Sequence, residues 1–299
     1  MSIRITVIFL MLICLFTSTA INPLKSDNRI RLLLIDGQSK YHPQWPEWTP
    51  ILLKQLDESG LFTVDVHTAP KAGSSFDEFN PRFGRYKVIL STYDGDLWPT
   101  RVQRSLERYM RKGGGLVVVH AANNAFPEWP EYNEMIGLGG WGDRNEASGP
   151  FVYLNQREEL IHDTSPGPGG HHGPRHEFVI VNRAPRHPIM QGLPDQWLHS
   201  EDELYQKLRG PARNMEILAT AFSAEKYEGT ERHEPQLMTM RFEEGRIFHT
   251  TMGHDRTALS CVGFMTTFVR GCQWAATGKV TFPVPEDFPG PHKTSSRSY

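Results

Sequence analysis

Four short strand-like runs, separated by stretches with helical spacing, constrain the fold of this chain more than any other feature. Residues 46–60 and 99–112 carry apolar side chains at the spacing of one helix face, and glycine ends both stretches. Short apolar strands that alternate with amphipathic helices are typical of a parallel sheet covered on both faces. We therefore predict an α/β fold with a doubly wound, mostly parallel sheet in a three-layer α/β/α arrangement. The strand-like runs cover residues 31–35, 62–66, 86–90 and 116–119.

The second half of the chain has weaker periodicity. Residues 123–175 are rich in glycine, proline, tryptophan and histidine without a clear period, which indicates a long loop, and loops of this length in a compact domain are usually functional or poorly ordered. A final helix is expected over 257–276. Further strands are expected over 178–181 and 217–221, followed by a hairpin that pairs 236–242 with 246–251.

The first twenty residues resemble a secretory signal peptide. Arg4 precedes an apolar run over residues 5–16, and Ser18 and Ala20 are small enough for a cleavage site. The sequence therefore predicts an exported protein, periplasmic or extracellular, with an uncleaved N-terminal anchor as the alternative. We expect a signal peptide over 1–20, a linker over 21–29, one α/β domain over 30–280 and a flexible tail over 281–299.

The charge balance limits the classes of partner. The chain has 32 Lys and Arg against 34 Asp and Glu, so it lacks the basic excess that nucleic acids or anionic membranes attract. We expect a small-molecule partner, no nucleic acid, no membrane contact once the signal peptide is cleaved, and no cofactor. A homo-oligomer is left open.

The two cysteines outside the signal-like segment are predicted to be free thiols. Cys261 and Cys272 fall in the one helix expected over 257–276. At the helical rise they would lie roughly 16 Å apart, which is too far for a disulfide. Both thiols are expected to be buried.

Polar residues follow several of the predicted strands. Sites in parallel sheets form at the carboxyl ends of the strands, so we expect Asp36, the segment 93–96 and His120 to meet at one edge. His42 and Trp45 lie in a proline-stiffened loop after the first strand. We expect both side chains to wall a pocket at that edge.

The sequence contains, in this order, the segments GGGLVVVHAA (113–122), DELY (202–205) and GRIFHTTMGHD (245–255), with three further segments between and after them. Together these six segments resemble the ThuA-like (trehalose utilisation) family over roughly residues 30–276. That resemblance implies a flavodoxin-like sheet of the class I glutamine-amidotransferase type. In those amidotransferases a sharp turn after a strand presents a nucleophilic cysteine. Here His120 occupies that turn, so cysteine-dependent glutaminase activity is not expected. The segments are GGGLVVVHAA (113–122), HPIMQGLP (187–194), DELY (202–205), PQLM (235–238), GRIFHTTMGHD (245–255) and the terminal helix ending in QWAATGK.

The resemblance also implies a role in carbohydrate utilisation, with trehalose or another disaccharide, as a keto-sugar, for the substrate class. An isomerase, lyase or hydrolase reaction would need acid/base groups, for which the residues suggest His120, Glu203 and His254. If the segment DELY is extended, Glu203 and Tyr205 face one side and Asp202 the other. The expected substrate-binding residues are Asp36, His42, Trp45, Asp202 and Tyr205.

Each of these residues also has a structural interpretation. His120 can tie a loop together, DELY can form a solvated acidic turn, and the residues at 254–255 can cap the last helix. Two other functions remain open for the whole chain. One is a non-catalytic sugar-binding or scaffold module that kept the pocket and lost the chemistry.

The other is a metal-assisted hydrolase that uses the histidine-rich part of the long loop. Neutral imidazole is the commonest metal ligand. However, no HExxH or paired CxxC motif is present, so no metal ligand is predicted. The histidines concerned are His162, His171, His172, His176 and His187.

Overall fold

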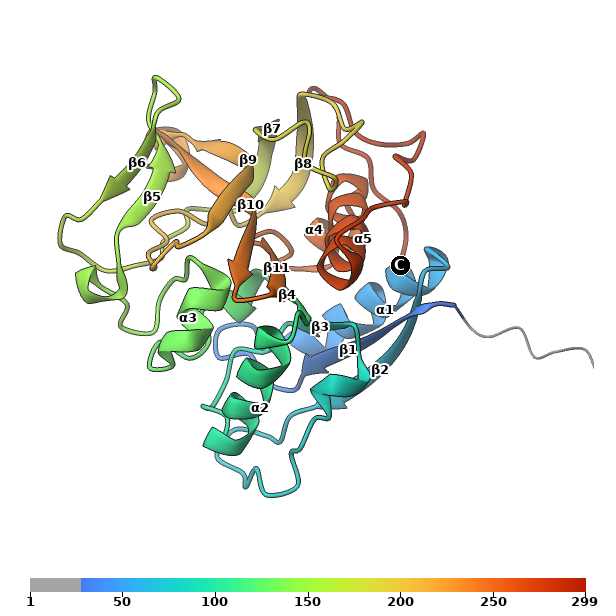
Figure 1. Ribbon diagram of the computed structural model, residues 1–299. Helices are drawn as coiled ribbons and strands as arrows, with labels where there is room; N and C mark the ends of the chain where they lie inside the picture. Colours follow the sequence, from blue (N-terminus) through green and yellow to red (C-terminus); the bar gives the residue numbers. More distant parts are fainter. Residues whose placement is uncertain (1–27) are drawn as a thin grey trace, which may run out of the picture.

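A mixed β-sheet forms the centre of the computed structural model, which describes residues 28–299 (Figure 1). Adjacent strands in one half of this sheet are all parallel. The short apolar segments of the inner strands are buried on both faces, as expected for parallel strands covered by helices, whereas the edge strand is largely exposed or half-buried. The strands, in spatial order, are β2 (Phe62–Thr68), β1 (Ile30–Asp36), β3 (Val88–Ser91), β4 (Gly115–Val119) and β11 (Gly245–Thr250).

The other half of the sheet is antiparallel. The predicted hairpin is confirmed, because β11 pairs with β10 from Leu237↔Thr250 to Phe242↔Gly245. The α/β class is confirmed as well, and the antiparallel strands make the sheet a mixed one. Beyond β10 (Arg232–Phe242) follow β9 (Met215–Ser223), β7 (His176–Asn182) and β8 (Gln196–Asp202), while β5 (Phe151–Leu154) and β6 (Leu160–Asp163) branch from β10.

Helices cover both faces of the sheet. Alternate residues of β1 point to opposite sides, so Leu32 and Leu34 pack in one core cluster and Leu33 and Ile35 in the other. The first cluster lies beneath α1 (Trp48–Glu58), α4 (Arg256–Ser260) and α5 (Val262–Thr277), and the second beneath α2 (Thr100–Arg111) and α3 (Pro130–Ile136).

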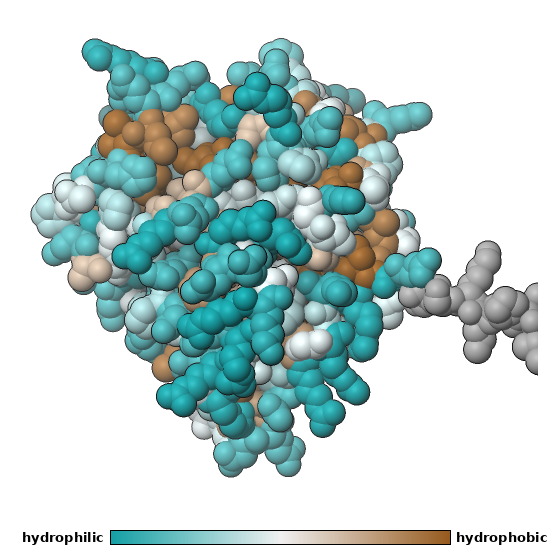
Figure 2. All heavy atoms as spheres, in the orientation of Figure 1, coloured by the Kyte–Doolittle hydropathy of each residue, from teal (hydrophilic) through white to brown (hydrophobic). Residues whose placement is uncertain are grey.

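The buried face of α2 shows why this segment is helical. Val102, Leu106 and Met110 recur at helical spacing and are buried against the sheet. Figure 2 shows that the surface over α2 is largely hydrophilic, whereas hydrophobic side chains gather on the same face near β5, β6 and β9. Burial of one apolar stripe therefore fixes the side that α2 turns to the core.

The last helix departs from its prediction. One continuous helix was expected over 257–276, but Cys261 adopts an extended conformation (φ −61°, ψ 128°) and separates α4 from α5. Asp255 caps α4, because its carboxylate accepts the backbone N–H of Ala258 at 3.0 Å. The thiol prediction is confirmed, since Cys261 and Cys272 are both buried and free.

Two buried guanidinium groups, those of Arg144 and Arg209, hold the long loop over 123–175. Arg144 donates to the carbonyl oxygens of Asn124 (2.8 Å), Ala125 (2.8 Å) and Gly140 (2.9 Å). These contacts order a segment without apolar periodicity, which also contains α3, β5 and β6. Polar bridges of this kind leave no periodic pattern in the sequence.

Residues 281–299, expected to be a flexible tail, pack against the domain. The carbonyl oxygen of Gly290 accepts the N–H of Leu198, and that of Ser295 accepts the N–H of Val262, each at 2.8 Å. Phe288 packs on the ring of Trp197. A segment rich in proline and serine is thus fixed by hydrogen bonds to β8 and to the start of α5.

The predicted signal peptide, residues 1–20, lies outside the described residues. Among residues 28–299, none of the helices combines the length and the apolar character that crossing a bilayer requires.

We expect Gly115→Ala to destabilise the fold. A Cβ at this position would lie 2.5 Å from the carbonyl oxygen of Ala275, so β4 and α5 would have to move apart. Overpacking of this kind costs about 1–3 kcal/mol. Thermal unfolding followed by circular dichroism measures the loss. The matched control is Gly84→Ala, because a Cβ there meets nothing within 4 Å, and equal melting temperatures for the two variants would contradict the packing described here.

Glu234 should make stability fall as the pH rises. Burial raises the pKa of this carboxyl to about 7 from 4.5, although Thr230 donates to it. Between those values the folded chain binds the proton more tightly than the unfolded chain, so stability is highest below pH 4.5 and decreases towards pH 7. Glu234→Gln should remove this pH dependence of the free energy of unfolding, measured with urea. Each unit by which folding raises the pKa corresponds to about 1.4 kcal/mol. The exposed Glu225→Gln should leave the slope unchanged, and an unchanged slope in Glu234→Gln would contradict the assignment.

Candidate functional site

His120 opens the turn that ends β4. It begins a 3₁₀ turn (His120–Asn123) and has φ of +46°, a left-handed conformation that is costly for a residue with a Cβ. The fully buried ring is held because its Nδ1–H donates to the carbonyl oxygen of Thr251 at 2.6 Å. A strained backbone conformation therefore places this imidazole at the carboxyl end of a central strand.

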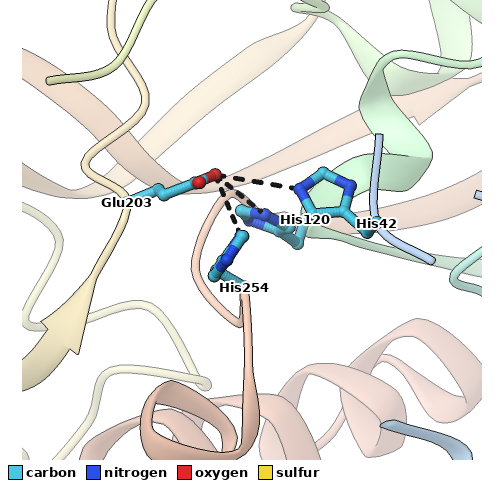
Figure 3. Close-up of side chains that lie close together, drawn as sticks. All are labelled: His42, His120, Glu203 and His254. Atoms are coloured by element: carbon cyan, nitrogen blue, oxygen red, sulfur yellow. Dashed lines mark ion pairs between the residues drawn. The ribbon is translucent and has the colours of Figure 1, made fainter. Parts of the chain in front are cut away.

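One carboxylate, that of Glu203, lies beside three imidazoles at this edge (Figure 3), and its Oε1 lies 3.5 Å from Nε2 of a fourth, His172. Oε2 of Glu203 lies 3.1 Å from Nδ1 of His254, 3.5 Å from Nε2 of His120 and 3.8 Å from Nε2 of His42. The four residues come from the loop after β1, the turn after β4, the end of β8 and the loop after β11. The predicted acid/base residues His120, Glu203 and His254 are thus brought together, and His42 joins them.

Asp202 lies beneath this cluster and fixes its backbone. Its carboxylate accepts the N–H groups of Glu203 (2.8 Å), Gly253 (2.8 Å) and His254 (3.1 Å). The side chain is fully buried and lines neither cavity described below. Asp202 was expected to bind a substrate, whereas the structure places its carboxylate beneath the cluster, where three backbone N–H groups bind it.

A second imidazole supports Asp202 from behind, and the sequence did not indicate it. His199 Nε2 donates to Oδ2 of Asp202 at 2.9 Å, and both side chains are fully buried. Burial opposes the charged imidazole, but Cys261 and Asp202 outweigh that effect and raise the pKa of His199 to about 10. Burial likewise opposes ionisation of Asp202, yet His199 holds the pKa of that carboxyl below its usual value. The two form a buried ion pair.

Tyr205 is connected to His120 directly and also through Gln236 and Thr251. Its hydroxyl donates to His120 Nε2 at 3.0 Å, which agrees with a ring whose proton sits on Nδ1. Gln236 donates to the carbonyl oxygen of Tyr205 at 3.0 Å and accepts the hydroxyl of Thr251 at 2.5 Å. Gln236, from the PQLM segment, therefore ties the strand-end turn to the DELY segment. Burial raises the pKa of Tyr205 well above its usual value.

The environment shifts the pKa values of His42 and His254 in opposite directions. Burial lowers the pKa of His42 to about 4, despite its contact with Glu203. Burial also disfavours charged His254, but Glu203 outweighs it and raises the pKa of that ring. Burial works against ionised Glu203 too, and the contacts with His120, His254 and His42 outweigh it, so the pKa of the carboxyl lies far below its usual value.

The cluster lies in a small cavity that adjoins a larger cleft. The small cavity has a volume of about 150 Å³ and the cleft one of about 770 Å³, and Tyr41 and Asn124 line both. Trp45 lies on the wall of the cleft, as expected for a pocket residue. Asp36 lines neither space, because its buried carboxylate accepts the hydroxyl of Thr49 at 2.6 Å. The small cavity is lined by Tyr41, His42, Asn124, Trp141, His172, Glu203, Tyr205 and His254.

Several lining residues were not named as site residues by the sequence analysis. Asp94 follows β3 in the segment expected at this edge, and burial raises the pKa of its carboxyl to about 6. Its Oδ2 is buried without a hydrogen-bond partner. Asn124, Trp141 and His172 lie in the loop over 123–175, where no periodic pattern marks the side that faces inward. The only sequence signal for Asp94 was its place shortly after a predicted strand.

Glu203 and the three imidazoles nearest its Oε2 are close enough to one another to hold a metal ion. Their nearest ligand atoms all lie within 4.8 Å of one another, although no metal ligand was predicted from the sequence. Among the histidines of the proposed metal-binding loop, His172 reaches the small cavity and the other four do not line it. The residues that meet this spacing are His42, His120, Glu203 and His254.

A cytoplasmic protein of Salmonella typhimurium LT2 shares this fold. The two chains are 16% identical with a TM-score of 0.50, over 82% of this chain and 99% of that one. That relative is described as cytoplasmic, which contradicts the export predicted from residues 1–20. Periplasmic or extracellular localisation is therefore withdrawn.

Two further solved structures are ThuA-like proteins. One, from Parabacteroides merdae, is 43% identical and covers 90% of this chain and 98% of its own, with a TM-score of 0.87. Another, from Bacteroides uniformis, is 18% identical over 85% and 93% of the two chains, with a TM-score of 0.56. No curated protein matches the chain. The family model for trehalose utilisation, ThuA, matches residues 31–275. The chain belongs to the ThuA family.

Proposed function

We propose that this chain is an enzyme of carbohydrate utilisation that performs acid/base chemistry on a sugar derivative. The observation that carries the proposal is the contact of one buried carboxylate, Glu203, with the imidazoles of His42, His120 and His254. Imidazoles exchange protons near neutral pH, and a positioned pair of imidazoles can serve as acid and base. Membership of the trehalose-utilisation family supports the substrate class.

The positions of His254, His120 and Glu203 suggest a different role for each. His254 borders the small cavity and retains some solvent exposure, which suits a group that exchanges a proton with a ligand. His120 is fully buried and reaches the cavity through the hydroxyl of Tyr205, which lies 3.0 Å from its Nε2. Glu203 lies beside the rings and compensates positive charge on either of them.

The cleft beside the cluster suits a sugar. Its volume of about 770 Å³ falls within the usual range for small-molecule sites, roughly 300–1,000 Å³. Both aromatic and polar side chains line it, so a sugar ring can meet apolar faces while its hydroxyls meet hydrogen-bonding groups. An oxidised (keto) sugar from disaccharide breakdown fits best, because a base beside a phenol can move a proton from a carbon next to a carbonyl. The lining includes Gln38, Lys40, Tyr41, Trp45, Asp94, Asp96 and Phe126.

Glu203→Gln should abolish most of the turnover and preserve the fold. The amide keeps the shape of the carboxyl but cannot compensate charge on the imidazoles, so kcat/KM for a keto-disaccharide should fall about 10²–10⁴-fold. Product formation by mass spectrometry across a panel of keto-sugars measures this effect. Glu201→Gln is the matched control, because Glu201 lies two residues earlier, on β8, and its side chain is exposed.

Calorimetry with the same sugars separates catalysis from binding alone. The proposal predicts both binding and product with the unmodified chain. Sugar binding without any product would support a non-catalytic binding module instead, and equal activity in Glu203→Gln and the unmodified chain would contradict the assigned chemistry.

A further inference from the structure

We propose that His42, His120, His254 and Glu203 form a binding site for one divalent transition-metal ion, and that zinc fits it best. This inference goes beyond the proposed function and does not depend on it, because ion binding is measured without a sugar. It stands on four observations: the spacing of the ligand atoms, the direction of the rings, the unpartnered atoms at the centre, and the composition of the ligand set.

The spacing matches a tetrahedral ion. Zinc binds imidazole nitrogen and carboxylate oxygen at about 2.0–2.1 Å, which places tetrahedral ligand atoms about 3.3 Å apart. Oε2 of Glu203 lies 3.1 Å from His254 Nδ1, 3.5 Å from His120 Nε2 and 3.8 Å from His42 Nε2. All four ligand atoms lie within 4.8 Å of one another. Small rotations of the side chains would close the set around one ion.

Two of the rings already have the orientation that metal ligands need. A ligating imidazole usually donates its other N–H to the protein, which fixes the tautomer and aims the lone pair. His120 donates its Nδ1–H to the carbonyl oxygen of Thr251 at 2.6 Å, so Nε2 carries the lone pair. Nδ1 of His42 lies 3.2 Å from the hydroxyl of Ser39, which leaves its Nε2 facing the cluster.

The centre of the cluster contains polar atoms that lack hydrogen bonds. Oε2 of Glu203 and Nδ1 of His254 are both buried without a hydrogen-bond partner in the described chain. Buried polar atoms without partners are costly and rare. A cation bound between the rings would satisfy both atoms. Tyr205, whose hydroxyl donates to His120 Nε2, would give up that bond to the ion.

The ligand set favours zinc over the alkaline-earth ions. Imidazole suits zinc and the neighbouring transition metals, whereas magnesium and calcium prefer oxygen ligands. Asp202 holds the backbone N–H groups of Glu203 and His254, so two ligands are positioned before an ion arrives.

Calorimetry with zinc chloride tests the site directly. The tag-free full chain is stripped with a chelator, titrated, dialysed and measured by elemental analysis. We expect one zinc per chain, no detectable binding of magnesium chloride, and visible absorption bands of tetrahedral cobalt(II) when cobalt replaces zinc. His42→Ala and His254→Ala should each weaken zinc binding by more than about tenfold. His162→Ala and His171→Ala, in the histidine-rich loop, are matched controls and should bind as the unmodified chain does.

Two results would overturn the inference. One is less than a tenth of a zinc ion per chain at saturation, and the other is unchanged affinity in His42→Ala and His254→Ala. Circular dichroism checks that each variant folds; if either alanine variant unfolds, Glu203→Gln replaces it, and unchanged affinity there also contradicts the site. Zinc binding in a chain that converts no sugar would keep this inference and count against the proposed function.

Discussion

An ionised carboxylate removed from water is the constraint on which the rest of this site depends. The penalty for burying an unpaired charge is several kcal/mol, and it must be offset by nearby partners. Glu203 meets this requirement through His42, His120 and His254, and Asp202 fixes the backbone that carries it. A carboxylate surrounded by imidazoles can either move protons or share a cation with the rings, which is why the two proposals arise from one geometry.

Both halves of the sheet are needed to build this arrangement. The parallel half supplies His42 and His120, which follow β1 and β4, and the loop after β11 supplies His254. The antiparallel half supplies Glu203 at the end of β8. Gln236 on β10 joins the two halves through Thr251 and the backbone of the DELY segment. The site therefore lies where the two kinds of strand pairing meet, and neither half contains it alone.

Local patterns in the sequence predicted the parallel strands, the hairpin and α1 and α2, because apolar periodicity directly reflects one-sided burial. The same reasoning brought His120, Glu203 and His254 to one edge, through the family motifs and the strand ends. It failed where long-range polar contacts determine the structure. Arg144 orders the loop over 123–175, and Asp202 turns inward to bind backbone N–H groups. The break at Cys261 was also hidden, since helix propensity does not report the β-bridge between Cys261 and Ser296 of the C-terminal segment.

A crystal structure of the full chain is the most direct measurement of this arrangement. The account predicts that one oxygen of Glu203 lies within about 4 Å of a ring nitrogen of each of His42, His120 and His254, with the ring of His120 hydrogen-bonded to the carbonyl of Thr251. A Glu203 carboxylate turned to solvent, or any of the three rings facing away from it, would contradict the shared site and leave the ThuA fold alone standing.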